Sequence, residues 1–137
     1  MSLFNVLDVG GSAMQAQSLR LNVTASNLAN AESISSSTGQ TYRARHPVFA
    51  PLVDEFGDAQ RGAGVRVLGV VESSVAPRQE YRPDHPLADA DGFIYMPNIN
   101  VVEEMANMIS ASRSYQAAVE MMSTSKQMLL GTLRLGE

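Results

Sequence analysis

Apolar residues repeat at intervals of seven near each end of the chain. The N-terminal series consists of Leu7, Met14, Leu21 and Leu28. The C-terminal series consists of Val101, Met108, Tyr115, Met122 and Leu129. A second series, four residues behind it, consists of Met105, Val119 and Leu133 and is interrupted by Ser112 and Lys126. Seven-residue spacing holds an apolar seam on one side of a helix, and such a seam needs another helix to cover it. The pattern predicts two long helices whose seams pack on each other or on further copies of the chain.

The stretch between these series has the composition of strands and turns. All six prolines lie there, at positions 47 to 97, and proline forbids a continuous helix. Valines crowd the segment 65–71, which favours a strand. The sequence Asp89-Ala90-Asp91-Gly92 is typical of a tight turn that leads into a short strand at 93–95. The serine-rich segment 32–40 has the composition of a loop.

These elements predict an α+β protein in three parts. Residues 1–31 form an N-terminal helix, residues 32–96 an irregular loop and a small β region, and residues 97–137 a C-terminal helix. We expect the two helices to pair as an antiparallel coiled coil, because each carries an apolar seam. The second helix has a clear start, since Asn100 suits the N-cap and Glu103 the third helical position.

The N-terminal helix is almost free of charge. Asp8 and Arg20 are the charged side chains among residues 1–30, and most other polar side chains are Ser, Thr, Asn or Gln. Small neutral polar groups cost less to bury than charges do. We therefore expect this helix to pack against protein on several sides.

Composition excludes several classes of function. The formal net charge is −4 and the basic residues are scattered, so no nucleic-acid partner is expected. Because no run of about 18 apolar residues occurs, no membrane span is expected. A charged leader followed by an apolar core is missing, so we expect no cleaved Sec signal. The chain has no cysteine, which excludes disulfides and thiol catalysis.

No constellation of residues suggests catalysis or metal binding. His46 and His85 both precede prolines and have no second ligand at helical spacing. Counting from Asp89, the pattern lacks the glycine and the glutamate that a calcium loop needs at its sixth and twelfth positions. We expect no enzymatic activity, no cofactor, no metal and no small-molecule substrate.

Two motifs resemble those of bacterial flagellar rod and hook proteins. The first is the segment 19–31, which contains Asn27-Leu28-Ala29-Asn30. The second combines residues 85–92, HPLADADG, with residues 97–105, PNINVVEEM. The similarity continues through residues 108–109, 112–117 and 126–129 and is weakest at about 53–75. In length and in both motifs the chain resembles the proximal-rod members of this family.

The resemblance implies a structural subunit of the axial rod, which crosses the periplasm and transmits motor torque. Its terminal helices would pack in an inner layer with the middle region facing outward. The implied partners are other copies of the same subunit, the rod proteins FlgB, FlgF and FlgG, the adaptor FliE and, during secretion, the flagellar type III export apparatus. Asn27 and Asn30 are then candidates for side-chain bonds that fix helix packing or the turn that follows. The alternative is a soluble coiled-coil adaptor or secretion chaperone that binds a partner helix.

Overall fold

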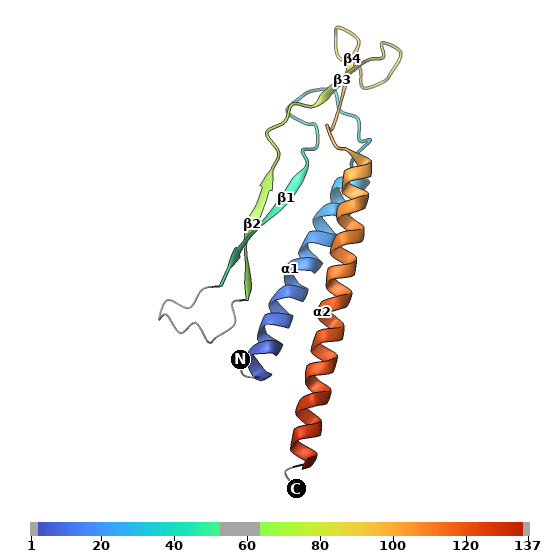
Figure 1. Ribbon diagram of the computed structural model, residues 1–137. Helices are drawn as coiled ribbons and strands as arrows, with labels where there is room; N and C mark the ends of the chain where they lie inside the picture. The colour runs from blue at the N-terminus through green and yellow to red at the C-terminus, as the bar shows by residue number, and fades with distance from the viewer. Residues whose placement is uncertain (1–2, 53–63, 136–137) are drawn as a thin grey trace. The chain divides into compact units, whose positions relative to one another are not determined.

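The computed structural model describes residues 3–52 and 64–135 (Figure 1). In chain order the elements are α1 (Leu3–Ala29), β1 (Arg45–Pro51), β2 (Val65–Glu72), β3 (Arg78–Tyr81), β4 (Phe93–Met96) and α2 (Val101–Leu135). Two long helices thus flank a middle region of short strands, which confirms the predicted α+β class. The segment 53–63 of the predicted β region lies outside the described residues.

Local side-chain bonds fix the start of α2. The Oδ1 atom of Asn100 accepts the backbone N–H groups of Val102, at 3.1 Å, and of Glu103, at 3.4 Å. These N–H groups have no partner within the helix, so the N-cap satisfies them. The predicted helix start is confirmed.

The middle region contains two sheets of two antiparallel strands, β1–β2 and β3–β4. Arg78 of β3 pairs with Met96 of β4, and Tyr81 pairs with Phe93. The serine-rich segment joins the second sheet, because Ser35 and Tyr95 exchange backbone hydrogen bonds of 2.9 and 3.1 Å. Two backbone polar groups of the loop are thereby satisfied.

The predicted turn at 89–92 is confirmed. The N–H of Gly92 donates to the carbonyl of Asp89 at 3.0 Å, and Gly92 has a φ of 82°. Glycine suits this position, because a Cβ there would lie 2.9 Å from the Tyr81 ring. The Asp89 carboxylate accepts the N–H groups of Asp91 and Phe93 and the hydroxyl of Tyr95.

The chain divides into two compact units. Unit 1 comprises Met1–Leu21, Pro47–Gly69 and Ile109–Glu137, and unit 2 comprises Asn22–His46 and Val70–Met108. Among the described residues, the buried apolar side chains of unit 1 are Ala16, Ala111 and Ala118, and those of unit 2 are Val23, Ala31, Ile94 and Met96. The cores are small, so little apolar area stabilises either unit.

Candidate subunit interface

Asn27, near the end of α1 in unit 2, is 1% exposed and uses its full bonding capacity. Its Nδ2 donates to the carbonyl of Arg45 at 2.8 Å and to Oε2 of Glu104 at 3.2 Å. Its Oδ1 accepts the N–H of Arg45 and the hydroxyl of Tyr42, both at 2.9 Å. An amide offers two donors and two acceptor positions. One side chain therefore joins the end of α1 to the start of β1 and the first turn of α2.

Asn30 has a more local role. Its Nδ2 donates to the carbonyl of Ser26 at 2.8 Å, and its own carbonyl accepts the Ser33 hydroxyl at 2.9 Å. Carbonyls in the last turn of a helix lack intrahelical partners. Asn30 thus helps to close the end of α1, and the side-chain bonds predicted for both asparagines are present.

Close contact between α1 and α2 in unit 1 occurs at Gly10, which is buried. A Cβ added at Gly10 would lie 2.6 Å from Sδ and 2.8 Å from Cγ of Met122, and 3.1 Å from Cε of Met121. The missing side chain allows this approach, so close packing explains why a glycine stands inside α1. In unit 1 Gly10 of α1 thus meets late α2, and in unit 2 Asn27 of α1 meets early α2.

The buried face of α2 is a series of small or polar residues at seven-residue spacing. It consists of Glu104, Ala111, Ala118 and Ser125, which are 7%, 0%, 8% and 2% exposed. Small side chains let a neighbouring segment approach the helix backbone closely. Sequence reasoning missed this series, because a search for large apolar residues passes over Ala and Ser, although the spacing itself was visible.

The predicted packing residues fall into two groups. The half-buried group consists of Leu7, Met14, Leu21, Leu28, Met108, Tyr115, Met122 and Leu129. The exposed group consists of Val101, Met105, Val119 and Leu133, of which Leu133 is 68% exposed. Asn27 is buried and Asn30 half-buried, as described above. The first group flanks the covered face of the helices, and the second group contacts solvent.

An apolar stripe therefore remains open on α2. We define the α2 outer stripe by the exposed residues Val102, Met105, Ile109, Val119, Leu130 and Leu133. Val102, Ile109 and Leu130 are separated by multiples of seven residues. Met105, Val119 and Leu133 are also separated by multiples of seven residues. Because the two series are offset by three residues, they are neighbours on the helix surface. Contacts within the chain thus use one side of α2 and leave a second side uncovered, whose exposed apolar residues are interrupted by Ser112 and Lys126.

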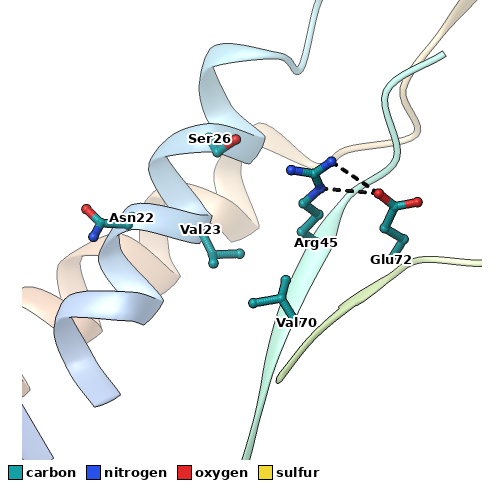
Figure 2. A pocket seen from close by; sticks show the side chains of 6 residues that line it. All are labelled: Asn22, Val23, Ser26, Arg45, Val70 and Glu72. Atoms are coloured by element: carbon teal, nitrogen blue, oxygen red, sulfur yellow. Dashed lines mark hydrogen bonds and ion pairs between the residues drawn. The ribbon is translucent and has the colours of Figure 1, made fainter. Parts of the chain in front are cut away.

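A shallow hollow of about 360 Å³ lies in unit 2 beside α1. Figure 2 shows Val23 of α1 pointing toward the strands and Val70 of β2 pointing back. At its rim Arg45 and Glu72 form an ion pair of 3.2 Å between half-exposed side chains. Such a pair contributes about 0–1 kcal/mol. Asn22 and Ser26 complete the lining.

Metal-ligating side chains do not cluster among the described residues. No group of three or more His, Cys, Asp or Glu side chains among them could hold a metal ion. His46 is exposed on β1, and Nδ1 of His85 accepts the backbone N–H of Leu87 at 3.1 Å. Within the same residues, neither helix is long and apolar enough to cross a membrane.

Comparison with known proteins identifies relatives over the whole chain. Residues 7–32 match the family described as flagella basal body rod protein, and residues 90–135 match the family described as flagellar basal body rod FlgEFG protein C-terminal. The flagellar basal-body rod protein FlgC of Salmonella typhimurium is 52% identical over 137 residues, which is 100% of both chains. The FlgC proteins of Escherichia coli O157:H7 and Yersinia enterocolitica are 53% and 49% identical over the same complete lengths.

Proposed function

Because the chain belongs to the FlgC family of flagellar basal-body rod proteins, we propose that neighbouring rod subunits close the α2 outer stripe with helices of their own. The chain is a structural subunit of the basal-body rod and not an enzyme. Its place is the flagellar basal body, where it assembles with other rod proteins. The adaptor or chaperone alternative has no support among its relatives.

The observation that carries this proposal is the uneven burial of α2. Its small-residue face is covered within the chain, whereas Val119, Leu130 and Leu133 are 40%, 46% and 68% exposed. Exposed apolar stripes on helices are typical of surfaces that bind another protein. A rod subunit has such neighbours on several sides, so the open stripe is a packing surface.

The proposal assigns roles to the three parts of the chain. Residues 1–31 and 97–137 form the inner packing layer as a coiled coil, and residues 32–96 face outward. The packing side chains are Leu7, Met14, Leu21, Leu28, Val101, Met105, Met108, Tyr115, Val119, Met122, Leu129 and Leu133. Asn27 and Asn30 act by fixing the end of α1, so that the helices present these side chains in one arrangement.

We further propose which part of the rod contains the subunit, which proteins it contacts and how it is exported. The subunit belongs to the proximal rod, which spans the periplasm and transmits torque, and it contacts further copies of itself, FlgB, FlgF, FlgG and FliE. It reaches the rod through the flagellar type III export apparatus without a cleaved signal peptide. The support is the full-length similarity to FlgC proteins together with the uncovered α2 outer stripe.

A charge placed in the stripe tests the proposal. L130E puts a carboxylate into the α2 outer stripe, and S114E adds the same charge at an exposed polar residue on another side of the same helix. We expect L130E to reduce swimming and the amount of the subunit in purified basal bodies, with monomer stability preserved because Leu130 is 46% exposed. S114E should behave like wild type. Wild-type swimming and basal-body content for L130E would contradict the proposal.

A further inference from the structure

The exposed residues of α1 form a single series along the helix. Between residues 5 and 29 they are Asp8, Gly11, Gln15, Ser18, Asn22, Ala25 and Ala29, whereas the other residues of this range are buried or half-buried. Alternating steps of three and four residues keep the series on one side of the helix. We call it the α1 outer stripe. A narrow side with a seven-residue repeat is the kind of helix face on which another helix packs.

The α2 outer stripe follows the same spacing once its polar interruptions are included. Four polar residues lie between its apolar members, namely Ser112, Gln116, Ser123 and Lys126. With them the series runs from Val102 to Leu133 in alternating steps of three and four residues. The α1 and α2 outer stripes therefore have matching repeats, and both contain polar positions.

Each series contains one charged residue, and the two charges are opposite. Asp8 and Lys126 are both exposed, and neither has an ion pair or a side-chain hydrogen bond within the described parts of the chain. Neither has an opposite charge three or four positions away on its own helix. The other exposed charges of α2 in unit 1 are Arg113, Glu120 and Arg134. Each of these follows a member of the series by one position and so lies about 100° round the helix, beside the stripe.

An antiparallel pairing of the two series matches charge with charge. With Asp8 opposite Lys126, three further pairs follow in unit 1, which are Gly11 with Ser123, Gln15 with Val119, and Ser18 with Gln116. In unit 2 the same register places Ala29 opposite Met105. A parallel pairing with the same ion pair fails, because α2 ends at Leu135 before it reaches the level of Ser18. The charges and the repeat therefore select one orientation and one register.

We propose that the α1 outer stripe of one copy docks antiparallel on the α2 outer stripe of another copy, with Asp8 paired to Lys126. The short side chains of α1 let the longer apolar side chains of α2 approach closely, and the ion pair fixes the register. The two faces differ, so the contact is heterologous and can be repeated from copy to copy. This inference rests on the proposed function and names the helix face that meets the α2 outer stripe.

Disulfide crosslinking gives a direct test, because the chain has no cysteine of its own. S18C/Q116C places thiols at two exposed polar residues that the proposed register brings together. The matched control S18C/S114C moves the second thiol to the exposed Ser114, on another side of α2. Both variants are incorporated into basal bodies, oxidised and separated without reductant. We expect a ladder of dimers and higher oligomers for S18C/Q116C and monomer for S18C/S114C.

Charge exchange adds a second readout that needs no cysteine. D8K or K126D alone should lower the amount of the subunit in purified basal bodies roughly two- to fivefold, because each places like charges opposite one another. The combination D8K/K126D should restore it. A missing ladder, equal ladders for both cysteine pairs, or no restoration by the double exchange would overturn the inference. Presence of the wild-type chain in basal bodies together with any of these results refutes this contact alone, whereas absence of the wild-type chain from basal bodies refutes the proposed function.

Discussion

The side-chain amide of Asn27 lies 3.2 Å from the carboxylate of Glu104, a residue 77 positions away in the chain. Both side chains are buried, at 1% and 7% exposure, although both are polar. Burial of polar groups is tolerated when they are hydrogen-bonded. The pair therefore joins the two terminal helices in unit 2 through a hydrogen bond of defined geometry.

Replacement of Asn27 should destabilise the monomer. N27A leaves the N–H and carbonyl of Arg45 and the Glu104 carboxylate without their bonds to the amide, and unsatisfied buried groups cost about 1–3 kcal/mol each. We expect a loss of about 3 kcal/mol or more. Urea unfolding followed by circular dichroism measures it. N22A, at an exposed position of the same helix, is the control and should change the midpoint little. Equal midpoints for the two variants would contradict the account.

The two adjacent glycines of α1 should respond in opposite ways to alanine. G10A introduces a Cβ into the space occupied by Met122, and overpacking costs about 1–3 kcal/mol. At Gly11 nothing lies within 4 Å of the added atom, so G11A should stabilise the helix by up to about 1 kcal/mol. Thermal unfolding of the two variants gives the comparison.

A second substitution tests the cause of the G10A effect. The M122A substitution shortens the side chain that contacts the added Cβ. G10A should therefore lower the stability of the M122A variant less than it lowers the stability of the wild-type chain. If G10A were as stable as G11A, close packing at Gly10 would be disproved.

The stability of the turn at Asp89 should depend on pH. The backbone N–H of Phe93, with further bonds from Tyr95, Asp91 and Gly92, holds the pKa of Asp89 below its ordinary value. Since the pKa is lower in the folded state, the stabilisation is present above the unfolded value of about 3.9 and is lost as the pH falls through the folded value. The bond to Asp89 also raises the pKa of Tyr95.

Carboxyl NMR titration measures this shift. Y95F removes the hydroxyl donor, so the pKa of Asp89 should rise toward its ordinary value. Y81F, which changes an exposed tyrosine of the same sheet, should leave the Asp89 titration unaltered. An Asp89 pKa at or above the ordinary value in the wild-type chain would show that the turn lacks these bonds.

Much of the fold follows from local patterns in the sequence. The two long helices, the N-cap at Asn100 and the turn at 89–92 depend on neighbouring residues, so the sequence predicts them. The bounds differ by a few residues, since α1 ends at Ala29 and α2 begins at Val101. The contacts of Asn27 with Tyr42, Arg45 and Glu104 depend on which distant segments meet, and spacing cannot show that. The buried face of α2 escaped prediction because its alanines and serine carry little apolar surface, although they allow the closest approach.

The similarity to rod proteins and the exposed apolar residues of α2 both support the same claim. Assembly into the rod covers the α2 outer stripe. L133C supplies a single thiol in the cysteine-free chain, at a residue 68% exposed in the monomer. Maleimide labelling is measured for the monomer, for intact purified basal bodies and for basal bodies denatured before labelling. The account predicts rapid labelling of the monomer and of the denatured sample, and strong protection in the intact basal body. Equal labelling of monomer and intact basal body would contradict it.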